Sequence, residues 1–477
     1  MLLTKYKPQK QTDMDELDLI FKTGKTNDEI IKALKRKSVV VPMWGGPKGL
    51  ESEFDPRRHP VMNKSIYPDA TDEDGRPELV TRITYDLQRL AVKRMSELVC
   101  GIPVQRIYKP ANEKQKEVAK WMEAIYRRNR IDSVNTQRCN MLFACCEVLT
   151  IWYAVEQPTN IYGFDSKLKL RCRNFSPMLG DDLYPLFDEF GDMIAMSVGY
   201  RRKVGSKNVN FFDSYTAEYH YKWSDEGGAW QLIQTEKISV GKIPAIYVYR
   251  PAPIWEDTSK IVYEMEWAMS RNGNYLRRNS KPLFVVFADE EIPYGGEKDE
   301  LREFRSVFQF PKGGSAQYVT WQQAVESLKF HVTELRQSFF TQLQLPDWSY
   351  ESMKSNPMSG ESRKQLFIDC QLKVKDESGP LLEFFDREVN VVRSFLKTAA
   401  PSGYEKDIDA LIVENEITPF TITDDKDTIN QLMAANGGKA LMSQRESIEE
   451  FGHSSDVDKT IKEIEEESKG DVFEPYE

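Results

Sequence analysis

The residues Gly24, Lys25 and Thr26 have the types that close a phosphate-binding P-loop, in which a lysine and backbone N–H groups hold the phosphates of a nucleotide. That motif also needs a glycine five residues before Gly24, where this chain has Leu19, and a strand before the turn, where the pattern is helical. Glu29 stands three residues after Thr26, at the spacing of a capping box. The sequence therefore predicts a capped helix here and no nucleotide site.

Metal or catalytic chemistry would need histidines, cysteines or carboxylates at defined spacings. The four histidines are scattered, with no HExxH motif or Cys/His cluster: His59, His220, His331 and His453. Three pairs of adjacent acids could in principle hold magnesium or share a proton: Asp181 with Asp182, Glu290 with Glu291, and Asp424 with Asp425. Adjacent acids in turns are usually only solvated, and no GxSxG motif, nor a GxGxxG after a strand, is present. We therefore expect that the protein is not an enzyme and that it has no catalytic residue, cofactor or bound metal.

The composition describes a folded chain of roughly three domains. Of 477 residues, 40% are hydrophobic and 29% are charged. The apolar stretches are too short to span a bilayer, so no membrane span is predicted. The first residues are polar and do not resemble a signal peptide, so secretion is not predicted.

The cysteines form no CxxC pair and are expected to be reduced: Cys100, Cys139, Cys145, Cys146, Cys172 and Cys370. The net charge is −10, and residues 449–477 carry −8 of it, which argues against gripping nucleic acid by a bulk positive field.

Helical patterns come first along the chain, and strands follow them. Residues 40–74 show no sustained period and predict an extended or looped arm. Apolar spacing predicts helices over residues 26–37, 77–99, 111–128 and 132–145. Branched and aromatic residues then predict strands over residues 148–155, 168–173, 183–188, 193–203, 209–212, 217–223 and 230–240. Turns such as the one at Gly227 and Gly228 favour an antiparallel meander.

A helix, a small β insert and a second helix make up the next part. Helices are predicted over residues 257–279 and 322–342, with a strand at 283–288 between them. A loop over residues 346–360 leads into a helical stretch at 361–397, which Gly379 and Pro380 should kink or break. A strand-like segment at 410–423 and further helices follow. The predicted fold class is therefore α+β.

Several segments, taken in chain order, have the pattern of a known family. They are the turn Gly101-Ile102-Pro103-Val104 after a helix, Ser176-Pro177 before Leu183-Tyr184-Pro185 and Ile194-Ala195, Gly241-Lys242-Ile243-Pro244-Ala245 before Asp257-Thr258-Ser259, Ser359-Gly360 with Lys364, and the acidic helix after Gly438 to Arg445. Across about residues 77–467 the chain resembles the portal proteins of tailed double-stranded DNA bacteriophages.

The resemblance implies a portal-like ring subunit with an α/β wing, a two-helix stem, a small β-containing clip, a long kinked helix and a helical C-terminal crown. The implied boundaries are 1–252 for the N-terminal arm and wing, 253–280 for the first stem helix, 281–321 for the clip, 322–345 for the second stem helix, 346–360 for the tunnel loop, 361–430 for the long helix and wing return, and 431–477 for the acidic crown.

The resemblance also implies a function. About twelve identical subunits would form a ring at one capsid vertex, assembled in the host cytoplasm. Double-stranded DNA would pass through its channel without sequence specificity during packaging and ejection, and would be retained between the two. The implied partners are a separate terminase motor, a major capsid or scaffold protein, and a head-completion or tail adaptor protein. A separate motor agrees with the missing P-loop, and no membrane is implied.

The tunnel loop is the candidate site. Between residues 346 and 360, Lys354 is the one cation, against Asp347 and Glu351. Such a loop could touch a passing polyanion without trapping it, because each neutralised phosphate adds affinity. The remaining candidates supply apolar bulk or hinge positions: Trp348, Tyr350, Met353, Ser359 and Gly360. The alternative is an ordinary surface loop, with its aromatic residues packed on its own subunit.

Two other functions remain open on the sequence alone. A capsid-associated adaptor or scaffold protein would share the lack of catalytic motifs, but it would not need a helix, β insert and helix. A metal-dependent nucleic-acid hydrolase would need the paired acids to converge around a divalent ion.

Overall fold

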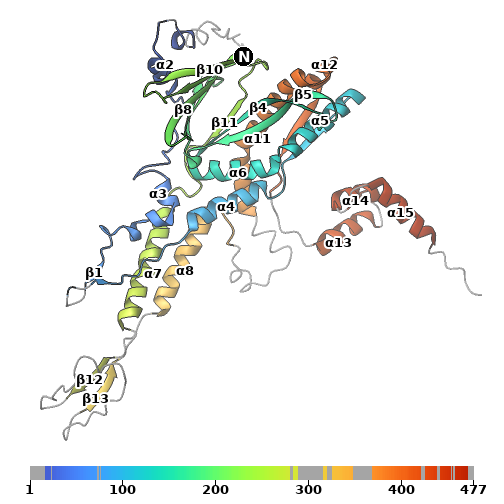
Figure 1. The fold of residues 1–477 in the computed structure, drawn as a ribbon. Coiled ribbons are helices and arrows are strands. Elements are labelled where there is room, and N and C mark those ends of the chain that lie inside the picture. The colour runs from blue at the N-terminus through green and yellow to red at the C-terminus, as the bar shows by residue number, and fades with distance from the viewer. Residues whose placement is uncertain are drawn as a thin grey trace, which may run out of the picture.

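The computed structural model describes residues 17–22, 24–71, 75, 77–279, 283–287, 315–319, 325–347, 368–419, 425–437, 441–452, 454 and 457–470. Helices and sheets together form a body, from which two helices project side by side (Figure 1). The mixed architecture confirms the α+β class. Every helix in the described part of the chain is too short or too polar to cross a bilayer.

Two antiparallel sheets form the β part of the body. The first has the order β11-β4-β5 and consists of β4 (Glu147–Thr159), β5 (Ser166–Phe175) and β11 (Ala245–Tyr249). The second is a meander in chain order, made of β6 (Asp182–Phe187), β7 (Met193–Val204), β8 (Lys207–Tyr215), β9 (Tyr219–Ser224) and β10 (Gln231–Lys237). The predicted meander is confirmed. The strand β11 was not predicted, and it returns to β4 only after the meander is complete.

The first half of β4 is buried on both faces, because it separates two apolar cores. Leu149 and Ile151 face a core shared with the meander, whereas Val148 and Trp152 face the helices. This alternation follows from the two-residue period of a strand. The strand β4 therefore holds the two halves of the body together.

The helix α2 (Asn27–Leu34) covers the meander and begins with the predicted capping box. The Glu29 N–H donates to Thr26 Oγ1 at 3.3 Å, and the Thr26 N–H donates to the Glu29 carboxylate at 2.9 Å. Ile31 and Leu34 belong to the same apolar cluster as Trp223 of β9. The Gly-Lys-Thr segment is thus a helix start.

Four helices form the largest core together with β4: α4 (Leu87–Cys100), α5 (Glu113–Arg128), α6 (Ile131–Cys145) and α11 (Ile368–Ala399). The side chains of Phe143, Phe384 and Phe385 are almost completely buried there. The short helix α12 (Glu405–Ala410) precedes β14 (Ile412–Glu416), which pairs with β3 (Gln105–Lys109) at the edge of this core.

The prediction of a helix from residue 77 was wrong, because α4 begins only at Leu87. Residues 77–78 form β2, which pairs with β1 (Ala70–Thr71), and the chain from 79 to 86 has no regular element. Along this stretch the N–H groups of Thr81, Ile83 and Tyr85 donate to side chains of a distant helix. These external bonds replace the bonds that a helix would have made.

We predicted that Gly379 and Pro380 would kink or break the helix at 361–397. The helix α11 continues through both residues, so a break is wrong, whereas a kink stays a prediction. A proline removes one N–H and leaves the carbonyl four residues earlier without its helical partner. This carbonyl belongs to Asp376. Asp376, Gly379 and Pro380 are all exposed, so water can reach it. On the opposite side Leu381 and Phe384 are buried in the core, which holds the helix in place.

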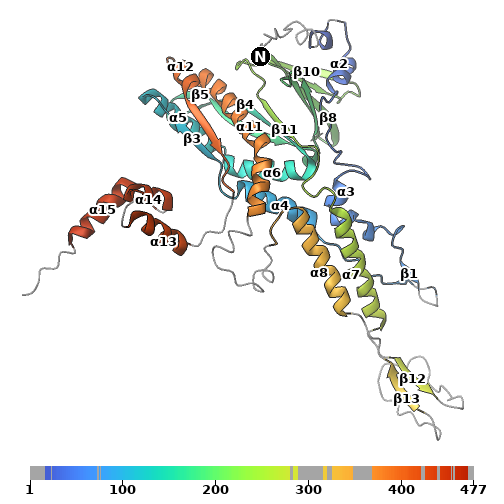
Figure 2. The same ribbon diagram turned by 180° about the vertical axis from the view of Figure 1, so that it is seen from behind.

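The two projecting helices are α7 (Ser259–Asn279) and α8 (Val325–Gln342). The strands β12 (Leu283–Phe287) and β13 (Ser315–Val319) pair in antiparallel register beyond their far ends (Figure 1). In both views α4 lies between the body and this helix pair (Figure 2). The last helices form a group of their own and are α13 (Asp425–Asn436), α14 (Gln444–Phe451) and α15 (Val457–Gly470).

A buried ion pair joins α6 to α11 in the centre of the body. Arg138 and Glu388 are each 1% exposed, and Arg138 Nη2 lies 2.6 Å from Glu388 Oε1. Trp152 Nε1 donates to the same carboxylate oxygen at 3.0 Å, and Arg138 Nε donates to Thr150 Oγ1 at 3.0 Å. These bonds partner charges that would otherwise be costly to bury, and Arg106 Nη2 lies 3.9 Å from Glu388 Oε2.

We predict that Arg138→Met destabilises the body by about 3–5 kcal/mol, because it leaves Glu388 buried without its close cation. Unfolding by urea, followed by circular dichroism, measures the loss. The control is Arg387→Met, which removes the exposed partner of Glu383 and should cost about 0–1 kcal/mol. Equal effects of the two substitutions would contradict the central role of the Arg138–Glu388 pair.

We also predict that Cys146 is nearly inert in the folded protein at pH 8. Burial raises the pKa of this thiol to about 12, whereas an unfolded cysteine has a pKa of about 8.5. Only the thiolate reacts, so native alkylation should be more than about a thousandfold slower than alkylation in urea, and it should speed up as the pH rises toward 12. Peptide mass spectrometry after iodoacetamide treatment measures both rates. Rapid labelling of the native protein at pH 8 would be the opposite result.

Candidate functional site

One face of the projecting helix α7 carries a row of polar side chains. The row is Ser259, Glu266, Ser270, Asn274 and Arg277. Spacings of three, four and seven residues place these side chains on one side of a helix. Their partners lie in residues 51–71 and 77–86, which we call the strap. The helix α7 is therefore bound along its length to the N-terminal part of the chain.

From Thr81 to Tyr85, every second N–H of the strap bonds to the next turn of this row. The bonds measure 2.6, 2.9 and 2.8 Å and join Thr81 to Asn274, Ile83 to Ser270 and Tyr85 to Glu266. Two extended residues advance about 6.7 Å and four helical residues about 6 Å, so the two repeats match. A Cβ on Gly273 would lie 2.7 Å from Thr81 Cγ2, so a glycine permits this close approach.

His59 and Glu266 are fully buried where the strap crosses α7. His59 Nδ1 lies 2.7 Å from Glu266 Oε1, and His59 Nε2 lies 2.8 Å from the carbonyl oxygen of Glu53. A carbonyl only accepts, so the bond network assigns a proton to Nε2, and the Nδ1–Oε1 contact must hold one further proton. The pair is thus neutral as a whole, which avoids burying an unpaired charge.

The N-terminal segment is anchored at two further points, one in the strap and one ahead of it. The Glu53 carboxylate accepts from Trp255 Nε1 at 3.0 Å and from Ser259 Oγ at 2.6 Å, at the start of α7. Ahead of the strap, Lys37 Nζ lies 2.6 Å from the buried carboxylate of Glu147 on β4. The N-terminal segment therefore connects the meander side of the body to the projecting helices.

Asp347 is the predicted loop candidate that the structure describes. It follows the end of α8, where its two carboxylate oxygens accept from Arg336 Nε at 2.9 Å and from Arg336 Nη2 at 3.2 Å. Its carboxylate thus lies against its own subunit. The other candidates lie outside the described residues: Trp348, Tyr350, Glu351, Met353, Lys354, Ser359 and Gly360.

Sequence reasoning predicted an extended arm over residues 40–74, which contains the first part of the strap, but it missed the continuation over residues 79–86 and the polar row that both parts bind. The row was readable as polar residues at helical spacing within residues 259–277. A polar helix face usually meets water, so this pattern alone did not indicate a partner. Arg336 was missed as well, since nothing in its neighbourhood marks it as the partner of Asp347.

The candidate acids do not form a metal centre in the described part of the chain. No group of three or more His, Cys, Asp or Glu residues is placed there to hold an ion. Asp181 is buried and accepts from the Ser176 N–H at 3.1 Å, and burial raises the pKa of Asp181, whereas Asp182 is exposed. Glu290, Glu291, Asp424 and His453 lie outside the described residues.

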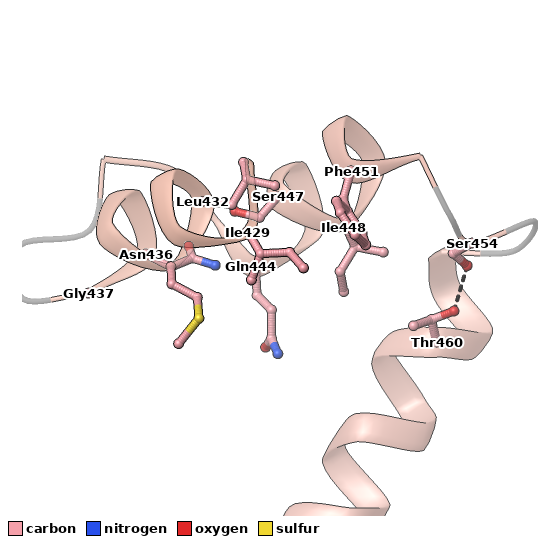
Figure 3. A pocket seen from close by; sticks show the side chains of 11 residues that line it. Ile429, Leu432, Asn436, Gly437, Gln444, Ser447, Ile448, Phe451, Ser454 and Thr460 are labelled. Carbon is pink, nitrogen blue, oxygen red and sulfur yellow. Dashed lines mark hydrogen bonds between the residues drawn. The ribbon is translucent and has the colours of Figure 1, made fainter. Parts of the chain in front are cut away.

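The C-terminal helices α13, α14 and α15 line an open pocket of about 690 Å³ (Figure 3). Its apolar lining includes Ile429, Leu432, Ile448 and Phe451. Among the described side chains of these three helices, only Ser447 is buried. This group therefore has no apolar core of its own within the described residues.

Comparison with known proteins gives one family and several structures. The family model "Phage portal protein, SPP1 Gp6-like" matches residues 49–472. The chain is similar to a chain in the neck of a native GTA particle computed with C12 symmetry, with 12% identity, a TM-score of 0.41, and coverage of 89% of this chain and 98% of that one. It is also similar to a chain in the neck of an empty GTA particle computed with C6 symmetry, with 11% identity, a TM-score of 0.40, and coverage of 86% and 95%. No curated protein matches the chain.

The family match extends over most of the chain. It begins at residue 49, just before the strap, and ends at residue 472, beyond α15. It thus includes the strap, both projecting helices, the strand pair at their ends and the acidic C-terminal helices. The chain belongs to the family of phage portal proteins, SPP1 Gp6-like, and is a structural, virion-associated portal protein.

Proposed function

We propose that this portal protein forms a closed ring of about twelve subunits at one vertex of the capsid, with double-stranded DNA passing through the central channel without sequence specificity. The observation that carries the proposal is the family match over residues 49–472. DNA enters through the ring during packaging, is retained, and leaves through it during ejection. The ring assembles in the host cytoplasm before it becomes part of the virion.

Exposed apolar side chains support assembly with further copies of the chain. On α8, Val325 is 56% exposed and Phe330 is 68% exposed. In the C-terminal group, Met433 is 67% exposed and Leu441 is 87% exposed. A closed ring offers each subunit two neighbours through the same pair of surfaces, and such neighbours cover apolar patches of this kind.

The elements take the following roles in this proposal. The body with its two sheets is the wing, α7 and α8 are the stem, and the β12–β13 pair lies in the clip. Residues 346–360 are the tunnel loop, and the acidic C-terminal helices are the crown. The position of the β12–β13 pair beyond the ends of the stem helices supports a protein-binding clip, because it lies far from the body (Figure 1).

The portal itself performs no catalysis in this proposal, and its partners are other proteins of the particle. A separate terminase motor supplies the energy of packaging. This agrees with the Gly-Lys-Thr segment, which caps α2 and does not form a nucleotide-binding P-loop. A major capsid or scaffold protein surrounds the ring, and a head-completion or tail adaptor protein binds after packaging. The acidic net charge of −10 supports a channel that passes a polyanion without holding it.

The ring is tested by the mass of the purified full-length protein. We expect a species of about 660 kDa, since twelve chains of 55.3 kDa would assemble. Mass photometry at moderate salt measures it directly. A population of monomers or two-fold dimers alone, at micromolar concentration, would refute the ring.

The tunnel loop is tested by Lys354→Ala in filled particles. Loss of a phosphate contact from each subunit should reduce DNA retention, and the salt dependence of DNA release should weaken by up to about 0.9 log units per contact. Release between about 50 and 200 mM salt is the measurement. The control is Lys406→Ala, an exposed lysine on α12. If Lys354→Ala and Lys406→Ala particles retain and release DNA alike, the loop does not contact DNA through Lys354.

A further inference from the structure

The chain reverses its direction directly after α8. The Leu345 N–H donates to the Phe340 carbonyl at 3.0 Å, and the Gln344 N–H donates to the Thr341 carbonyl at 3.1 Å. This pair of bonds is the Schellman motif, which ends a helix with one residue in the left-handed region. That residue is Gln344, with a φ of 52°. The chain is thus turned back toward the helix that it has just left.

A glutamine is an unusual residue for this turn. Glycine normally occupies the left-handed position, because a Cβ makes that conformation unfavourable. The turn must therefore be held by contacts around it. Leu343 and Leu345 supply two of these contacts, since they are buried at 3% and 5% exposure in the same core as Phe340.

The third contact is polar and lies furthest along the reversed chain. Asp347 reaches back to Arg336, which is eleven residues earlier and within the last turns of α8. Both oxygens of the carboxylate are bonded, in the two-point geometry that favours an arginine–carboxylate pair. The Arg336 guanidinium also lies 5.8 Å from the centre of the Phe340 ring. The ion pair therefore closes the turn on the side that leads into residues 348–360.

We propose that Arg336 and Asp347 form a positioning clasp, which fixes the direction in which the chain leaves α8 and so places the tunnel loop relative to the DNA channel. The inference rests on the proposed function for the role of the loop, but the clasp itself depends only on residues 336–347. Neither residue needs to contact DNA. Their role is to orient the residues that follow them.

A partly exposed ion pair can also contribute nothing measurable. The clasp differs from such a pair in a way that can be tested, because exchanging the two charges should restore its effect. We therefore compare Arg336→Glu, Asp347→Arg and the double variant. The control is Arg387→Glu, which breaks the exposed pair with Glu383 on α11.

The first measurement is hydrogen exchange of peptides from residues 348–360 in full-length rings, with each variant corrected for its intrinsic exchange rates. Each single variant should exchange at least about fivefold faster than the unchanged protein, because the turn opens more often. The double variant should return to within about twofold, and the control should not change. Unchanged exchange in the single variants, or no recovery in the double variant, would overturn the clasp.

The second measurement is DNA retention in filled particles carrying the same variants. We expect lower retention in the single variants and recovery in the double variant. If exchange responds while retention does not, the clasp stands and the channel-lining role of the loop fails. If the charge reversals prevent ring assembly, Arg336→Lys and Asp347→Asn replace them, since each removes the two-point geometry with a milder change, and the criterion of faster exchange then decides.

Discussion

The strap's hold on α7 is the constraint on which the projecting part of the molecule depends. The helix α7 carries a row of polar side chains, and N–H groups of the extended strap bond to three of them. The buried His59–Glu266 pair lies within this ladder and shares one proton, so neither group can be removed without stranding the other. Removing one partner of a buried pair typically costs about 3–5 kcal/mol. The N-terminal segment is thereby bound firmly to α7.

The contacts of the strap with α7 lie close to those of α8 with Asp347. Tyr85 of the strap donates its N–H to Glu266, and the positive charge of Arg336 acts on the Tyr85 phenol, whose pKa is raised by burial. Arg336 in turn holds Asp347, the last described residue before residues 348–360. The strap binds α7, which in turn packs against α8, the helix that carries Arg336.

Local signals in the sequence predicted the local structure well. The capping box at Thr26, the end of α4 before Pro103 and the meander of β6 to β10 each depend on neighbours in the chain, and each was predicted correctly. Partners far away in the sequence decided the rest. Residues 77–86 have a helical pattern, but their N–H groups bond to a helix nearly 190 residues away. Of the candidate site, Asp347 was predicted as a loop residue, while its bond to Arg336 depends on an unusual left-handed Gln344.

We propose that DNA passes through a ring of this chain, with residues 346–360 nearest to the duplex. The most direct measurement is cryo-electron microscopy of DNA-filled particles, reconstructed around one vertex without imposed symmetry. The account predicts a ring of this chain at that vertex, with duplex density on its axis and the body containing the two sheets on the outside. A chain distributed over the capsid faces, or a ring whose axis is occupied by its own sheets, would contradict the account.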